Sequence, residues 1–298
     1  MNFKFRQLQA FRAIARSGSI TRAAAELNVS QPAVSRLLAD FSKMVDFPLF
    51  RRESGSMIPT TEAEYLLAEI TRIFESLDHL EDLRHNLKKR NAGHLRIACL
   101  PGFATSHLPK VLLEFLQDRP QVTVTIEPDR PERILEWIVG QQYDCGITDG
   151  FSGHPATKST DVTLRTVCIL PKGHVLAKKT MIMPRDLRGE KLIHSRRDSP
   201  FFQDLEGAFS AHDEPLNSWI EVRQFTTACT FVSEGHGVSI VSALDAEQYR
   251  DRGIEIRPFE PQTTHRLSLL RPATSSASPL VLDFLRYFSD SLAPFSVT

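Results

Sequence analysis

The spacing of hydrophobic and polar residues changes twice along the 298-residue chain. In residues 1–60, apolar side chains recur every three or four positions in short runs, as in amphipathic helices. Residues 61–90 keep a longer apolar seam with alternating three- and four-residue steps. Residues 91–298 alternate strand-like apolar runs with helical ones, which is typical of an α/β domain. The pattern therefore predicts three parts with these boundaries.

Three short helices joined by tight turns are predicted near the N-terminus. The first follows residues 5–15, and Ser17-Gly18 ends it. Ser19 can cap the second helix, residues 21–27, whose alanines allow close approach to a neighbour. Asn28-Val29 then turns the chain into the third. The arrangement fits a helix-turn-helix, whose third helix enters the major groove of DNA by its N-terminal residues. A small structural helix bundle is the alternative.

The third helix combines a buried face with a free one. We expect Ser30 at the N-cap, where its hydroxyl accepts a free backbone N–H, and Pro32 in the first turn. The apolar face carries Val34, Leu37, Leu38 and Phe41. The opposite face carries Pro32, Ser35, Arg36 and Ala39. The second face is thus free to touch another molecule.

Residues 47–60 favour a β-hairpin around Gly55. This wing would carry Arg51 and Arg52, for which phosphate contact is the natural use. Charge agrees with this interpretation, because residues 1–60 hold nine Lys or Arg against four acids, a net charge of +5. Residues 61–90 carry −2 and residues 91–298 carry −3, so only the first part favours a polyanion.

A helix of nearly thirty residues is predicted next, opened by a capping box of Thr61 and Glu64. Its seam, interrupted at Arg84, consists of Ala63, Leu66, Ile70, Ile73, Leu77, Leu80 and Leu87. Such a seam must be buried, and a second copy of the helix is the simplest partner, so we expect a dimer. Packing within the same chain is the alternative.

The third part is predicted to form βαβ units with a parallel sheet. Strands are expected at residues 94–100, 121–127, 143–149, 163–170, 219–224, 237–242 and 265–272. Helices are expected at residues 106–117, 131–140, 200–212, 226–234 and from about residue 280. Gly235-His236-Gly237 resembles a dinucleotide loop, but it follows a helix and Ile240 occupies the place of the third glycine. We interpret it as a tight turn.

Ligands of such sheets collect at the carboxyl ends of strands. This rule selects Pro101, Gly102, Thr105, Ser106, Thr148, Asp149, Arg196, Arg197, Ser199 and Thr226. Among them, Asp149 could pair with an ammonium group, and Arg196 or Arg197 with a carboxylate. Capping or surface roles are the alternative for each of these residues.

Other chemistry is weakly indicated. The four cysteines, Cys99, Cys145, Cys168 and Cys229, show no metal-ligand spacing, so we expect structural, reduced thiols rather than redox sensors.

The motifs of zinc proteases, P-loop NTPases and serine hydrolases are absent, so we expect neither an enzyme nor a cofactor. No run of 18 apolar residues and no secretory signal occurs, which favours a cytoplasmic protein without membrane contact.

The stretch SGSITRAAAELNVSQPAVSRLLADF, followed by LFRR and IPTTEAEYLL, resembles the winged helix-turn-helix and linker helix of LysR-type transcriptional regulators. Looser similarity continues through RIACLPGFATSHLP, PKGHVLA and EGHGVSIVS, and therefore covers almost the whole chain. Within the family, the C-terminal part resembles the regulator of diaminopimelate decarboxylase and the regulators of opine catabolism. Asp149 matches an acidic position of these relatives.

The resemblance implies a winged helix-turn-helix, a linker helix and a two-lobed effector domain like periplasmic binding proteins of type 2. Lobe I would comprise residues 91–162 and 264–298, and lobe II residues 163–263. It also implies a homotetramer, a dimer of dimers, in which an effector between the lobes changes how promoter DNA is bent. The residues implied at the DNA are Ser30, Gln31, Pro32, Ser35, Arg36, Arg51 and Arg52.

The chain also departs from its relatives. Ser54 and Ser56 replace wing arginines, so fewer phosphate contacts are expected. The loop Leu100-Pro101-Gly102-Phe103 lacks the ligand-binding threonines of some relatives, so backbone N–H groups and Thr105 or Ser106 would have to serve. The leading hypothesis is a DNA-binding regulator gated by an amino-acid-like effector such as diaminopimelate, lysine or an opine. Alternatives are a regulator of aromatic or redox signals, a fused pyridoxal-phosphate enzyme and a transport solute-binding protein.

Overall fold

The computed structural model describes residues 3–53, 55–88, 93–273 and 277–297, and the side chains of Glu75 and residues 78–88 lie outside this description. The chain divides into two compact units, Met1–Lys88 and Lys89–Thr298. None of the helices in the described ranges combines the length and hydropathy that a membrane span requires.

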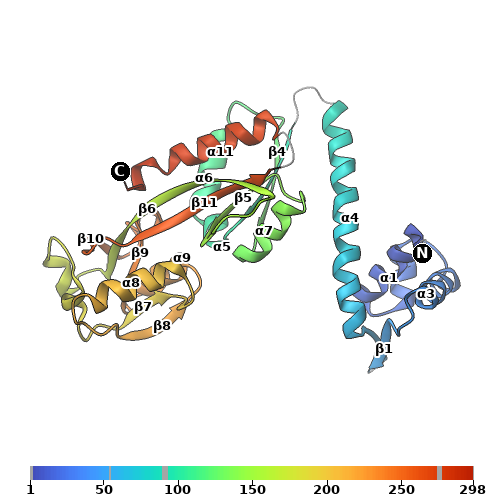
Figure 1. Cartoon of the computed structure of the whole chain (residues 1–298), viewed down its shortest axis with the longest axis horizontal. Helices are drawn as coiled ribbons and strands as arrows, with labels where there is room; N and C mark the ends of the chain where they lie inside the picture. The colour runs from blue at the N-terminus through green and yellow to red at the C-terminus, as the bar shows by residue number, and fades with distance from the viewer. Residues whose placement is uncertain (1–2, 54, 89–92, 274–276, 298) are drawn as a thin grey trace. The chain divides into compact units, whose positions relative to one another are not determined.

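The N-terminal unit contains the predicted three helices, the hairpin and a long helix (Figure 1). In chain order these are α1 (Phe5–Ser17), α2 (Ile20–Glu26), α3 (Gln31–Val45), β1 (Phe50–Glu53), β2 (Ser56–Pro59) and α4 (Thr61–Lys88). The rings of Phe11 and Phe41, both fully buried, hold α1 against α3 with centroids 5.4 Å apart. As predicted, the Ser19 hydroxyl caps α2 by accepting the backbone N–H of Arg22.

Two predicted helix caps differ from those observed. Ser30 is the N-cap of α3, but its hydroxyl makes no capping hydrogen bond. A capping side chain accepts from the N–H of the second or third helical residue, here Pro32 or Ala33. Pro32 has no N–H, and the N–H of Ala33 already donates to the Ser30 carbonyl at 3.0 Å. In α4, Thr60 rather than Thr61 is the capping residue: its hydroxyl accepts from Ala63 N–H at 3.3 Å and donates to the Pro48 carbonyl at 2.7 Å.

The apolar seam of α4 is divided between two environments. Ala63 and Ile70 are buried in the core of the N-terminal unit, so this part of the seam packs within the chain. Ile73 and Leu77 are 48% and 36% exposed, which leaves them available to a partner. The seam residues Leu80 and Leu87 and the interrupting Arg84 are among the side chains outside the description.

The C-terminal unit is built on a nine-stranded sheet with the order β4-β3-β5-β11-β6-β9-β7-β8, and β10 pairs with β6. Its strands are β3 (His94–Cys99), β4 (Thr123–Pro128), β5 (Cys145–Asp149), β6 (Thr157–Pro171), β7 (Leu192–Ser195), β8 (Ser218–Val222), β9 (Val238–Ser242), β10 (Ile254–Pro258) and β11 (Thr264–Pro272). Strands β3 to β5 are mutually parallel and form the first half-sheet, and β7 to β9 likewise form the second.

Each half-sheet is parallel, as the βαβ pattern predicts, whereas the junction of the half-sheets is antiparallel. Strands β6 and β11 pair antiparallel over nine residue pairs, from Thr264 opposite Arg165 to Pro272 opposite Thr157, and connect the two halves (Figure 1). The start of β6, residues 157–161, is polar and largely exposed, so its sequence carries no apolar strand signal.

Helices pack on both half-sheets. They are α5 (Pro101–Thr105), α6 (His107–Leu116), α7 (Pro131–Val139), α8 (Pro200–Ser210), α9 (Phe225–Ser233), α10 (Ala243–Gln248) and α11 (Pro279–Ser291), with 3-10 turns η1 (Val175–Lys178), η2 (Pro184–Leu187) and η3 (Ala293–Phe295). Phe115 of α6 and Phe284 of α11 share the core of the first half, and Phe209 and Phe259 lie in that of the second. The sequence did not predict β7, β10, α5, α10 or the 3-10 turns.

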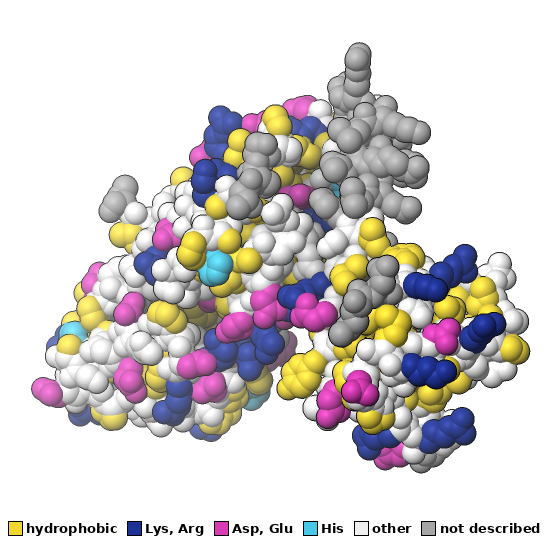
Figure 2. Space-filling model, turned by 45° about the vertical axis from the view of Figure 1, so that its right-hand side comes forward, with side chains coloured by type: hydrophobic (Ala, Val, Ile, Leu, Met, Phe, Trp, Pro, Cys, Tyr) yellow, Lys and Arg dark blue, Asp and Glu magenta, His cyan; other side chains and the backbone are white. Residues whose placement is uncertain are grey.

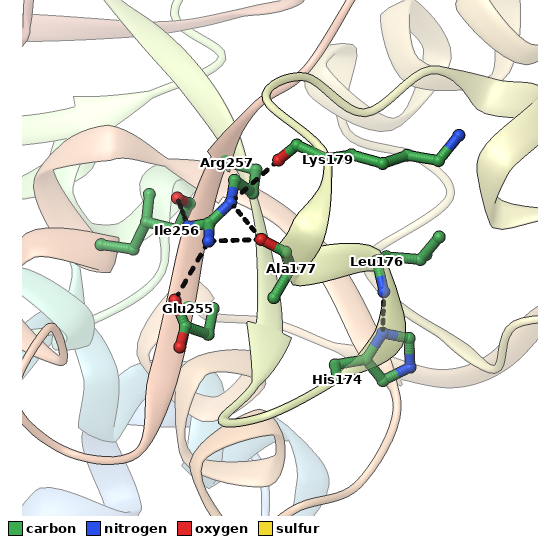
Figure 3. A network of polar contacts seen from close by, with 7 residues as sticks. All are labelled: His174, Leu176, Ala177, Lys179, Glu255, Ile256 and Arg257. Carbon is green, nitrogen blue, oxygen red and sulfur yellow. Dashed lines mark hydrogen bonds and ion pairs between the residues drawn. The ribbon is translucent and has the colours of Figure 1, made fainter.

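Two segments singled out in the sequence have structural roles. Gly235 and Gly237 have φ angles of +88° and +67°, and a Cβ at Gly237 would lie 2.8 Å from the Lys191 carbonyl, which confirms the tight turn. Arg257, on β10, holds the PKGHVLA segment by hydrogen bonds to its backbone (Figure 3). The Nε of Arg257 donates to the carbonyls of Ala177 and Lys179 at 2.9 and 3.1 Å.

All four cysteines are buried and unpaired. Burial raises the pKa of Cys99 to about 12 and raises those of Cys145, Cys168 and Cys229 well above the usual range. A thiol must ionise to react with oxidants, so these environments favour structural cysteines over redox sensors.

Candidate functional site

The first candidate surface is the N-terminal half of α3. Gln31, Pro32 and Arg36 are exposed and Ser35 is half-buried, whereas Val34 is fully buried on the other side of the helix. The Gln31 side-chain amide donates to the Ser35 hydroxyl at 3.1 Å. The structure therefore presents these predicted residues on one polar face, and the predicted Ser30 precedes it, also exposed. Further Lys and Arg side chains lie on the surface of this unit (Figure 2).

The hairpin adds two exposed arginines. Arg51 forms an ion pair with Glu53 at 3.1 Å, while Arg52, opposite Met57 in the hairpin, makes no ion pair with any residue in the described ranges. Arg52 is thus the wing cation whose charge is more available to a phosphate. Of the two serines that distinguish this wing, Ser56 begins β2 and Ser54 lies outside the described residues.

The second candidate site is a cavity of about 790 Å³ in the C-terminal unit. Its walls come from the segments that follow β3, β4, β5, β7, β8 and β9, and from the start of β11. Such carboxyl ends of parallel strands are where open α/β sheets bind ligands. The predicted residues found in the wall are Pro101, Gly102, Asp149, Arg196 and Ser199.

Five predicted effector residues lie outside this wall. Thr148 is buried beside Asp149 because consecutive strand residues face opposite sides of the sheet. The hydroxyls of Thr105 and Ser106 donate to the backbone carbonyls of Pro101 and Gly102, at 3.3 and 2.6 Å.

The remaining two side chains point elsewhere. Arg197 lies 3.9 Å from Glu221 and over the Phe202 ring, and 63% of its side chain is exposed, so Arg196 is the arginine that faces the cavity. Thr226 lines a second, shallower pocket together with Thr105. These five side chains therefore do not line the main cavity.

The most informative wall residue was missed in the sequence analysis: His265, on β11, is 5% exposed. Leu267 pairs with Asp149 across β11 and β5, so His265 lies diagonally across the same face. Its Nε2 is 3.5 Å from a carboxylate oxygen of Asp149. The rings of Phe201 and Phe225 stand edge to face with the imidazole. Neither ring nitrogen has a hydrogen-bond partner among the residues that the structure describes.

Asp245, in the first turn of α10, was also missed. It is 6% exposed and lines the cavity. It lies shortly after the end of the buried strand β9, so the rule that ligands collect at the carboxyl ends of strands could have selected it. Burial raises the pKa of its carboxyl from 3.8 to about 6, opposed by the smaller, lowering influence of His265.

Charges of both signs line the cavity. The acidic residues are Asp129, Glu132, Asp149, Asp198, Asp204 and Asp245. The arginines are Arg130, Arg196, Arg223 and Arg266. Within the described part of the chain, no group of His, Cys, Asp and Glu side chains is arranged to hold a metal ion. The cavity instead offers partners for both ends of a zwitterion.

Comparison with known proteins connects both candidate sites to regulators. Residues 5–64 match the family model described as bacterial regulatory helix-turn-helix protein, lysR family, and residues 88–293 match that of the LysR substrate binding domain. The transcriptional activator protein LysR of Escherichia coli is 35% identical over 280 residues, which cover 94% of this chain and 90% of that protein.

Two further similarities extend this comparison. The octopine catabolism/uptake operon regulatory protein OccR of Rhizobium meliloti is 32% identical over 284 residues, covering 95% of this chain and 94% of that protein. The crystal structure of full-length CbnR complexed with its target DNA superposes with a TM-score of 0.80 at 21% identity, covering 97% of this chain and 100% of that one.

Proposed function

Because the chain belongs to the LysR family of DNA-binding transcriptional regulators, we propose that it uses α3 to read promoter DNA and the cavity of its C-terminal unit to sense an amino-acid-like effector. The observation that carries the proposal is the cavity wall, where Asp149 lies at the end of β5 and Arg196 follows β7. An α-amino acid presents an ammonium and a carboxylate group to such a pair.

The DNA contacts follow from the two exposed surfaces of the N-terminal unit. Ser30, Gln31, Pro32, Ser35 and Arg36 would meet bases and nearby phosphates in the major groove. Arg51 and Arg52 would contact the backbone from the wing, with Arg52 the stronger contributor because Glu53 already partners Arg51. The polar face of α3 supports this assignment.

The relatives guide the choice of effector class. The Rhizobium meliloti relative is named for octopine catabolism and uptake, and octopine is an opine. Opines, lysine and diaminopimelate all carry amino and carboxylate groups, so they match the charges of the wall. The relatives compared above are regulators, and we assign this chain no enzymatic reaction or cofactor.

The same proposal fixes the organisation of the chain. The DNA-binding domain would comprise residues 1–60, the linker helix residues 61–90, and the effector domain residues 91–298, with lobes at 91–162 plus 264–298 and at 163–263. The chain would act in the cytoplasm as a dimer of dimers. The exposure of Ile73 and Leu77 on α4 supports a helix partner in that assembly.

The proposed effector class is tested by unfolding the full-length protein in the presence of lysine, diaminopimelate, octopine or aromatic acids. A ligand at about 100 times its dissociation constant adds about 2.7 kcal/mol to the free energy of unfolding. The tryptophans Trp137 and Trp219 both lie in the C-terminal unit, so their fluorescence follows the unit that holds the cavity. Stabilisation by an amino-bearing compound supports the proposal, and stabilisation by aromatic acids alone contradicts it.

Replacing Asp149 with alanine is expected to weaken binding of the stabilising compound about tenfold, because a partly exposed charge-assisted contact to ammonium is lost. Calorimetry on the full-length protein measures this change. Operator affinity in the absence of effector should stay unchanged, since Asp149 lies in the other unit. Undiminished effector affinity would exclude Asp149 as the ammonium partner.

Replacing Arg52 with alanine is expected to lower the affinity for DNA several-fold, by the same factor for any base sequence, because a phosphate contact carries no sequence information. The slope of log affinity against log salt concentration should become shallower by about one per subunit. The Arg51→Ala variant, whose charge is partly matched by Glu53, should have a smaller effect. Anisotropy titrations at several salt concentrations compare the two. An unchanged salt slope for Arg52→Ala would show that the wing arginine does not contact phosphate.

A further inference from the structure

His265 and Asp245 are both buried at the cavity wall, where buried polar groups normally have hydrogen-bond partners. Within the described part of the chain, neither ring nitrogen of His265 has a hydrogen-bond partner. Burial raises the pKa of the Asp245 carboxyl from 3.8 to about 6, so the buried site disfavours its charged form. Yet both residues line the cavity and are at least nine-tenths buried. Such groups are costly to bury, which indicates that a ligand supplies the missing partners.

These groups converge from different parts of the sheet. Asp149 ends β5 of the first half-sheet, and Asp245 follows β9 of the second. His265 stands between the two half-sheets, on the connecting strand β11, 3.5 Å from Asp149 and close enough to Asp245 to influence its ionisation. A group bound here would therefore touch both halves of the C-terminal unit at once.

We propose that Asp245, His265 and Asp149 form a cation subsite, which receives an ammonium or guanidinium group at the inner end of the effector. This inference rests on the proposed function and deepens it, since it specifies how the effector is oriented. The carboxylate end would face Arg196, the carboxylate partner proposed above, together with the exposed Arg223 and Arg266 of the cavity wall. The effector would thus carry its cationic group inward and its acidic groups outward.

The charges and packing favour an organic cation over other occupants. Two carboxylates face one imidazole, so the subsite repels an anion and attracts a cation. The described residues do not form a metal site, and an ammonium or guanidinium group donates several hydrogen bonds that the two carboxylates can accept. The rings of Phe201 and Phe225 cover the imidazole, which limits access of water and strengthens the attraction.

The subsite makes binding depend on pH. A cation requires ionised Asp245, whose pKa of about 6 means that its carboxyl is increasingly protonated below that pH. On the elements packed around α10, burial keeps the neighbouring titratable groups neutral: it raises the pKa of Cys229 on α9 and lowers that of His107 on α6 to about 4. Asp149, His265 and Arg223 face the same cavity from β5, β11 and the end of β8. Affinity should therefore fall as pH decreases through 6, by up to about tenfold per pH unit.

The experiment compares full-length wild type, Asp245→Asn and Asp204→Asn by calorimetry. The probes are lysine, diaminopimelate, octopine and norleucine, which resembles lysine without the side-chain cation. Asp204 lines the same cavity but is exposed, so its variant is the matched control. At pH 7.5, we expect Asp245→Asn to weaken a cationic probe about 30-fold or more, and Asp204→Asn less than about threefold. Norleucine should bind wild type more weakly than lysine.

The pH series separates a direct contact from a general structural effect. Wild-type affinity should fall between pH 7.5 and pH 5, whereas Asp245→Asn should lose most of this dependence. Equal binding of a cationic probe by wild type and Asp245→Asn would overturn the subsite while leaving the proposed function intact. Equal losses in Asp245→Asn and Asp204→Asn would also overturn it. If no amino-bearing probe binds wild type, both the subsite and the proposed effector class are wrong.

Discussion

Arg36→Ala is expected to lower affinity for operator DNA about a hundredfold while leaving the protein folded. Arg36 is exposed on the face of α3 opposite the buried Val34, so its removal should not disturb the core. A bidentate arginine contact to a base contributes about 1–3 kcal/mol, and a symmetric dimer would lose this contact at both half-sites. Anisotropy titration of a selected operator at one fixed salt concentration measures the loss.

Lys43→Ala is the matched control for this prediction. Lys43 is also exposed on α3, but it lies in the last turn, away from the N-terminal residues expected at the DNA. It removes the same unit of charge and should change affinity only a few-fold. Equal losses for the two variants would indicate that Arg36 acts through overall charge. Unchanged binding by Arg36→Ala would remove the residue from the interface.

Asp245→Asn is expected to raise the free energy of unfolding of the C-terminal unit at pH 7.5 by up to about 3 kcal/mol in the absence of effector. Burial raises the carboxyl pKa from 3.8 to about 6, so the folded state disfavours the charged form. This penalty is fully present above pH 6 and vanishes below 3.8, and the difference corresponds to about 3 kcal/mol. The amide is uncharged and nearly the same size, so it avoids the penalty.

Denaturant unfolding followed by fluorescence of Trp137 and Trp219 tests this expectation at several pH values. The stabilisation should be largest near pH 7.5 and should decrease steadily toward pH 4. A variant less stable than wild type at pH 7.5 would show that the charged carboxylate already has a favourable partner in the unliganded protein. Gain in stability together with loss of effector binding is the pattern typical of a residue kept for function.

The helices and the hairpin of the N-terminal unit could be predicted because each has a local signal. Gly18 and Asn28 mark turns with positive φ, and Gly55 marks the hairpin. The caps were less predictable, since the Pro48 carbonyl that fixes the Thr60 hydroxyl lies twelve residues away. In the C-terminal unit, the polar start of β6 depends on its long pairing with β11, which no local pattern reveals.

The candidate site was predicted only in part for a similar reason. Ligands of open sheets collect at the carboxyl ends of strands, and this rule selected Asp149 and Arg196, which line the cavity. It could not decide which of two consecutive residues faces the cavity, and Thr148 and Arg197 lie outside the wall. His265 lies near the start of β11 rather than at its carboxyl end, so only the pairing of β11 with β5 brings it to Asp149.

The most direct test of the account is the bend of operator DNA bound to the full-length protein, measured by energy transfer between dyes at the DNA ends. We expect lysine, diaminopimelate or octopine to change this bend at pH 7.5, and we expect Asp245→Asn to bind the operator but no longer respond. A protein that binds no selected DNA would contradict its proposed action on promoters. An operator complex whose bend is the same with and without every amino-bearing compound would contradict effector gating.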